Sequence, residues 1–159
     1  MPRRPLGFLA FLALLAVVPL PLAAQLRPLR VTGMQGITFG TLLPGVTTTV
    51  GPADAVRGAR FDVTGNKDAL VEFTFLLPAA LAGPGATLPL SFSAASAGFS
   101  QSGTTAGMKL FDPRLPYTGT LSNNGRASVF LGATVAPSGS QWPGAYSNVV
   151  TITVAELSL

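Results

Sequence analysis

The sequence contains no histidine and no cysteine, and only 10% of its 159 residues are charged. Without an imidazole or a thiol, the chain cannot form a Ser-His-Asp or Cys-His nucleophile, a zinc site with nitrogen or sulfur ligands, or a disulfide. Only carboxylates remain for acid–base chemistry, and a glycosidase-type site needs two of them beside one bond. We interpret Asp62 and Glu72 as members of solvated sheet faces. We therefore expect no enzyme activity, no catalytic residue, no bound metal and no cofactor.

Residues 1–24 have the pattern of a secretory signal peptide. Two arginines precede an apolar stretch at residues 6–18, two prolines follow it, and small residues lead to Gln25. A membrane anchor is the rival interpretation, but a span needs about 20 apolar residues and the prolines interrupt this run. We expect export to the periplasm, the cell surface or the extracellular space. After cleavage we expect no membrane span and a single domain over residues 25–159.

The remaining chain carries little charge. Loss of the two leader arginines lowers the formal net charge from +4 to +2, and the other basic residues are scattered. Binding to nucleic acid depends on clustered Lys and Arg that neutralise phosphates, so we expect no nucleic-acid partner. An exported chain of this length without disulfides must be stable through packing alone.

Short apolar runs with a period of two indicate β-strands. The clearest runs lie at residues 61–63, 71–75, 88–92, 129–135 and 146–154. They contain β-branched and aromatic residues, which suit a half-buried pleated surface. No amphipathic stretch is long enough for a helix. The pattern predicts an all-β fold, with two antiparallel sheets packed as a sandwich.

Glycine, proline and asparagine separate these runs. Asn124 and Gly125 both tolerate positive φ, and they predict a tight hairpin between residues 120–121 and 127–129. The small, polar residues 94–107 predict a long surface loop, with at most a weak edge strand.

Trp142 is the single tryptophan of the chain. Large aromatic side chains are usually buried in small cores, so we expect its indole to close one end of the sandwich near Tyr146. Contact with a sugar or a protein partner is the second interpretation.

Several motifs of the mature chain consist of turns and strand ends. They are ITFGTLLPG at residues 37–45, ARFDVTG at 59–65, LLP at 76–78 and TLSNNGRA at 120–127. These motifs resemble a bacterial secreted family labelled domain of unknown function 4402. The closing stretch QWPGAYSNVVTITV, residues 141–154, is also similar to the end of spore coat protein U-like pilins of the chaperone-usher system.

This resemblance implies an immunoglobulin-like, pilin-like β-sandwich that serves as a fimbrial or cell-adhesion subunit. In such pilins the groove of a missing strand is filled by a chaperone strand and then by the N-terminal extension of the next subunit. The partners implied are copies of the chain, related subunits and a periplasmic chaperone. The residues implied are Leu26, Leu29 and Val31 as donor strand and Val150, Ile152 and Val154 as acceptor edge, together with a first strand at residues 37–39.

A self-complete secreted binding module is the alternative function. In that case residues 25–40 fold back as the missing strand, and the loop at residues 94–107 contacts a ligand. The sequence leaves both functions open.

Overall fold

The computed structural model describes residues 26–157, so the predicted leader lies outside the described residues. The strands are β1 (Arg30–Gln35), β2 (Thr48–Val50), β3 (Ala59–Thr64), β4 (Leu70–Leu76), β5 (Ala80–Ala82), β6 (Thr87–Ser91), β7 (Ala97–Ser100), β8 (Lys109–Phe111), β9 (Tyr117–Thr120), β10 (Arg126–Leu131), β11 (Ala133–Val135) and β12 (Thr151–Glu156). Within residues 26–157 there is no helix long and apolar enough to cross a membrane.

Every strand pairing is antiparallel, which confirms the predicted all-β sandwich. One sheet has the strand order β1-β3-β10-β7-β8, and it packs against a sheet of order β12-β4-β9. Aromatic rings join the two layers: the ring centroids of Phe73 on β4 and Phe99 on β7 are 5.6 Å apart, and Phe75 on β4 meets Phe61 on β3 at 6.4 Å.

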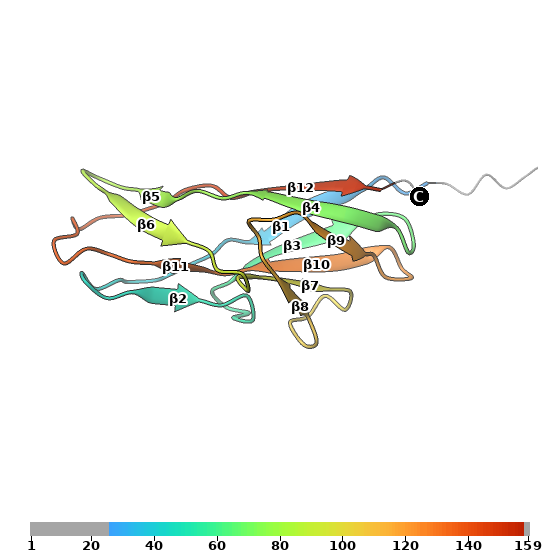
Figure 1. The fold of residues 1–159 in the computed structure, drawn as a ribbon, viewed down its shortest axis with the longest axis horizontal. Coiled ribbons are helices and arrows are strands. Elements are labelled where there is room, and N and C mark those ends of the chain that lie inside the picture. Colours follow the sequence, from blue (N-terminus) through green and yellow to red (C-terminus); the bar gives the residue numbers. More distant parts are fainter. Residues whose placement is uncertain (1–25, 158–159) are drawn as a thin grey trace, which may run out of the picture.

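A third sheet, of order β2-β11-β6-β5, continues the molecule beyond the sandwich and makes it elongated (Figure 1). We call it the distal sheet. β10 runs into β11 through Gly132, and β4 is followed closely by β5. A side chain at Gly132 would collide with the main chain of Val50 and Gly51, so glycine permits this change of strand partners. Leu88 and Leu90 of β6 pack with Ala133 and Val135 of β11 in a second small core.

The prediction of a surface loop at residues 94–107 is wrong for its central part. Residues Ala97–Ser100 form β7, which lies between β10 and β8 and is buried along its whole length. Phe99 packs against Phe73, and its ring lies directly over Gly119. Ala97 and Gly98 have too little side chain to show the apolar–polar alternation of a strand in the sequence. Small residues suit this crowded inner strand, because the Met108 side chain packs directly on Gly98.

The turn predicted at Asn124 and Gly125 forms, but it does not make a hairpin. Gly125 has φ 68°, and its N–H donates to the carbonyl of Ser122 at 2.8 Å. The strands on either side belong to different layers, because β9 pairs with β4 whereas β10 pairs with β3 and β7. The turn therefore connects the two sheets of the sandwich.

Candidate functional site

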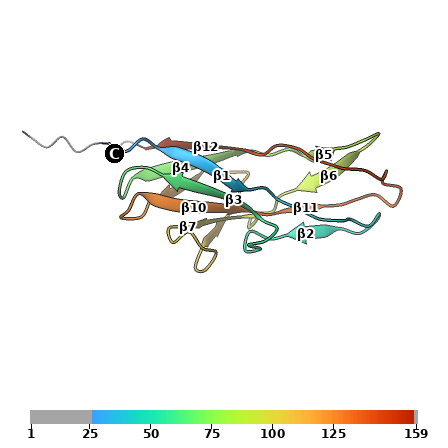
Figure 2. The ribbon, with the colours of Figure 1, turned by 180° about the vertical axis from the view of Figure 1, so that it is seen from behind.

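Two strands form neighbouring open edges of the sandwich. Among the described strands, β1 pairs only with β3, and β12 pairs only with β4. They lie along the same side of the molecule, one in each layer (Figures 1 and 2). An edge strand leaves one row of its main-chain donors and acceptors without a strand partner. This side therefore contains the candidate site.

The chain leaving β1 extends this open edge. In residues 37–42, Ile37, Phe39 and Leu42 are half-buried and pack against the core of the distal sheet, whereas the residues between them are exposed. The one main-chain hydrogen bond recorded for this segment is donated by Thr38 N–H to the carbonyl of Arg57, at 2.8 Å. Ile37 and Phe39 thus alternate with exposed neighbours as in a strand. The first strand predicted at residues 37–39 does not form, because no other described strand pairs with this segment.

A groove with a volume of about 1030 Å³ lies between this segment and residues 141–150. Its apolar floor includes Phe61 of β3, Leu81 of β5 and Leu88 of β6. Gly33 of β1 stands opposite Phe61, and a Cβ at Gly33 would lie 3.9 Å from that ring. Because Gly33 has no side chain, the Phe61 ring remains open to the groove.

The other rim of the groove is fastened by side-chain hydrogen bonds. The amide of Gln141 donates to the Tyr146 hydroxyl at 2.8 Å, and that hydroxyl donates to the carbonyl of Trp142 at 2.7 Å. The Tyr146 ring packs closely against Gly83 in the β5–β6 turn. These contacts hold residues 141–146 against the distal sheet.

Trp142 does not close the sandwich as we expected, because 64% of its surface is exposed. One side of its indole rests on Gly85, where an added Cβ would lie 3.6 Å from the ring. The hydrogen bond from the Tyr146 hydroxyl is accepted by the main-chain carbonyl of Trp142, and the side chain of Trp142 lies at the mouth of the groove.

The predicted donor residues differ in their positions. Leu26 is 82% exposed, whereas Leu29 packs against the main core. Val31 lies in β1 and pairs with Val63 of the same chain. In this structure Leu29 and Val31 are therefore part of their own sandwich, and their donation to another copy stays a prediction.

The predicted acceptor residues lie on or just before β12. Ile152 and Val154 point toward the main core from the edge strand, and Val150 packs against the same core. Of these three residues, only Val150 lines the groove. Most of the groove is instead formed by residues 33–44 and 141–148. Among these, the sequence indicated residues 37–39 as part of the acceptor edge, and Trp142 only in the second interpretation of that side chain.

Asp62 and Glu72 do not come together, because β3 and β4 belong to different sheets. Burial opposes ionisation of Asp62, but hydrogen bonds from Arg60 and Ser128 outweigh it and lower the pKa of this carboxyl. Nothing among residues 26–157 groups three carboxylates as a metal site would require.

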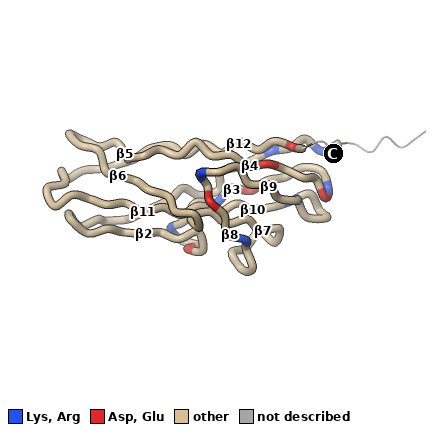
Figure 3. The backbone as a smooth tube through the Cα atoms, viewed as in Figure 1, with Lys and Arg blue, Asp and Glu red and all other residues tan. Residues whose placement is uncertain are grey.

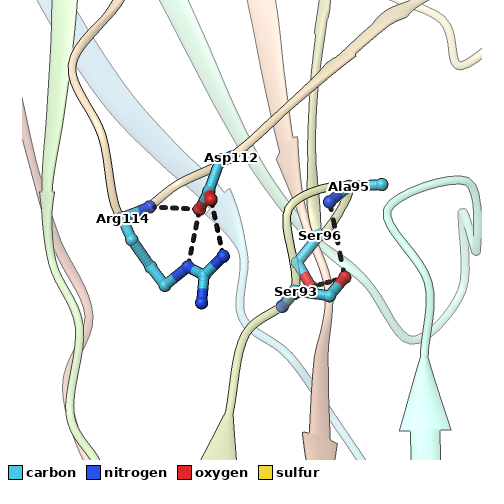
Figure 4. A network of polar contacts seen from close by, with 5 residues as sticks. All are labelled: Ser93, Ala95, Ser96, Asp112 and Arg114. Carbon is cyan, nitrogen blue, oxygen red and sulfur yellow. Dashed lines mark hydrogen bonds and ion pairs between the residues drawn. The ribbon is translucent and has the colours of Figure 1, made fainter.

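Asp112 has a local structural role at the β8–β9 connection (Figure 4). Arg114 donates to both of its carboxylate oxygens, at 2.8 and 2.6 Å. The side-chain and main-chain hydrogen bonds from Arg114 lower the pKa of Asp112. Ser93 and Ser96, also drawn there, bond to each other in the turn before β7. The polar side chains of Asp112, Ser93 and Ser96 therefore make their hydrogen bonds within their own turns.

No protein-family model matches the chain, and no curated protein matches it. A function for the chain is therefore inferred from the geometry of the groove and its rims.

Proposed function

We propose that this chain is an exported structural or adhesive subunit, pilin-like and immunoglobulin-like, that acts by accepting a β-strand in the groove. One rim of the groove already pairs with β5, through two main-chain hydrogen bonds between Ser147 and Ala82. The observation that carries the proposal is the apolar groove of about 1030 Å³ between this rim and residues 39–42, which make no main-chain hydrogen bond within residues 26–157. An added strand satisfies such main-chain groups and places alternate side chains in the groove. A copy of the chain, a related subunit or a periplasmic chaperone would supply that strand.

The floor of the groove favours a strand with apolar residues at alternate positions. Phe61, Leu81 and Leu88 provide apolar contact on one side, while the main chain of residues 39–42 provides donors and acceptors that make no other main-chain hydrogen bond in the described chain. The position of β1 limits the source of the strand: a copy that donates Leu29 and Val31 must first release β1 from β3. A strand from a chaperone or a related subunit needs no such exchange.

The alternative function is a self-complete secreted binding module. The packing of Leu29 and the pairing of β1 with β3 favour it, because the N-terminal segment already contributes to the sandwich. Deletion of residues 25–30 separates the two functions. Because Leu29 packs against the main core, the deletion should lower the stability of the monomer in either case. A strand acceptor should still bind a chaperone, whereas a self-complete module should bind none.

Substitution of Gly33 tests the groove directly. Gly33→Leu should place a side chain over Phe61, where the Cβ has ordinary contact distances, and should block strand entry without disturbing the core. Gly51→Leu is the matched control, because a Cβ at Gly51 meets no atom within 4 Å and Gly51 does not line the groove.

The measurement is light scattering of the chain from Gln25, alone and co-expressed with a periplasmic chaperone. We expect the unchanged chain and Gly51→Leu to assemble or to form a chaperone complex. We expect Gly33→Leu to do neither. A stable monomer that binds no chaperone and never assembles would contradict the proposal, as would equal assembly of both variants.

A further inference from the structure

The charged residues among residues 26–157 occupy one half of the elongated molecule (Figure 3). Residues 31–53, 73–108 and 127–155 contain no Asp, Glu, Lys or Arg, and these stretches include all four strands of the distal sheet. The charges gather toward the end where the described chain begins and ends (Figure 3). Asn66 joins those two ends, accepting from the N–H of Arg27 and donating to the carboxylate of Glu156. The opposite end is uncharged.

Connections from three parts of the chain meet at this uncharged end, which we call the distal pole: residues 41–47, 83–86 and 136–146. Gly45 N–H donates to the carbonyl of Ser138 at 3.0 Å, which joins the first to the third. Trp142 rests on Gly85, which joins the third to the second. Large apolar side chains are exposed on two of them, at 65% for Leu43, 49% for Val46 and 64% for Trp142.

The exposed indole is held in place before any partner arrives. The bonds from Gln141 to Tyr146 and from Tyr146 to the Trp142 carbonyl fix the main chain beside it. Ordering a loop normally costs conformational entropy on binding, and this loop has already been ordered by the fold. The exposed indole is therefore presented on a loop whose main chain is already fixed by hydrogen bonds.

We propose that the distal pole inserts into the interface of a lipid bilayer with zwitterionic headgroups. Tryptophan is enriched at membrane interfaces, where an apolar ring with one polar group fits the boundary between headgroups and acyl chains. Leucine and valine beside it add apolar area that leaves water on insertion.

The charge distribution selects this occupant over others. The pole has no Lys or Arg to attract anionic lipids or nucleic acid, and no carboxylate to attract a basic peptide. Specific protein interfaces bury about 800 Å² on each partner and are edged by polar pairing. The pole exposes large apolar side chains without charged groups beside them, and a bilayer accepts such side chains without matching their shape. This inference concerns the pole and goes beyond strand acceptance.

Because Trp142 is the single tryptophan of the chain, its fluorescence reports on the pole and on the mouth of the groove beside it. The experiment adds phosphatidylcholine vesicles to the chain from Gln25, which contains every strand of the structure. We expect the emission to shift to shorter wavelength and to saturate with lipid. The apparent affinity should be unchanged at about 1 M salt, which screens charges beyond about 3 Å.

Two double variants test which residues carry the binding. Leu43→Ser with Val46→Ser should weaken vesicle binding at least about tenfold, because both remove exposed apolar surface at the pole. Val56→Ser with Leu115→Ser is the matched control, since these exposed residues lie beside Arg57 and Arg114 in the charged half. The control should bind vesicles unchanged, and so should Gly33→Leu, whose failure in assembly concerns only the groove.

The proposal would be overturned if phosphatidylcholine vesicles left the Trp142 emission wavelength unchanged. Vesicle binding that requires anionic lipid or is lost at high salt would also overturn it. Equal weakening by both double variants would overturn it as well. A shift produced by a neutral oligosaccharide but not by vesicles would assign the pole to a sugar instead.

Discussion

Phe73 is the most deeply buried aromatic residue of the sandwich, with no exposed surface. Its ring lies 5.6 Å from Phe99 and 6.4 Å from Tyr117, measured between ring centroids. Phe73→Ala should lower the free energy of unfolding by about 3–5 kcal/mol, because it removes apolar contacts and leaves a cavity. Leu76→Ala on the same strand is the control, and it should change stability by no more than about 0.5 kcal/mol, since Leu76 is 73% exposed. Urea unfolding measures both variants, and an equal loss of unfolding free energy in Phe73→Ala and Leu76→Ala would contradict this arrangement of the core.

The contact between Ser128 and Asp62 predicts a dependence of stability on pH. The Ser128 hydroxyl is buried and donates to the Asp62 carboxylate at 2.7 Å. This bond helps to lower the pKa of Asp62 in the folded state. Ionised Asp62 therefore stabilises the fold above its ordinary pKa of about 3.9, and that stability is lost as pH falls through the lower folded pKa.

Ser128→Ala should consequently destabilise the protein by about 1 kcal/mol at neutral pH. The difference from the unchanged chain should shrink as pH falls from about 5 toward 2. Urea midpoints measured along this titration check the prediction. Ser91→Ala, which touches no carboxylate, should give a difference that is independent of pH. A Ser128→Ala difference that grows in acid would show that the assigned contact is wrong.

The anchoring of β1 leads to a prediction for that element. Leu29 packs against the main core just before β1, whereas Leu26 in the same segment is largely exposed. Leu29→Ser should lower the free energy of unfolding by about 1–2 kcal/mol, and Leu26→Ser should leave it within about 0.5 kcal/mol. Chemical unfolding of the monomer measures both. Equal unfolding free energies for Leu29→Ser and Leu26→Ser would mean that residues 26–29 are free in solution and available as a donor strand.

Elements with regular alternation could be predicted from the sequence, and irregular ones could not. The alternation of Val71, Phe73 and Phe75 marked β4, and Val150, Ile152 and Val154 turned toward the core as their spacing indicated. β7 was missed because Ala97 and Gly98 carry too little side chain to show a pattern. The turn at Asn124 was recognised, but local sequence does not determine whether the strands beside a turn pair with each other.

At the scale of the whole molecule, the groove depends on contacts between distant segments. The sequence indicated residues 37–39 and Val150, and Trp142 as a second interpretation, but not the floor from β3, β5 and β6. Trp142 was expected to be buried because aromatic side chains usually are, whereas the structure places one side of its indole on Gly85 and fixes its main-chain carbonyl through Tyr146, with most of the ring exposed. Both results arise from tertiary contacts that no local pattern records.

Strand acceptance by the groove is the central claim, and amide hydrogen exchange tests it most directly. The isolated chain should exchange the amides of Phe39, Gly40 and Thr41 rapidly, because no hydrogen bond is recorded for them. In the assembled or chaperone-bound protein, these amides and those near Val150 should exchange at least about tenfold more slowly, since an added strand would pair with the rims. Assembly without slower exchange along residues 37–42 would contradict the account.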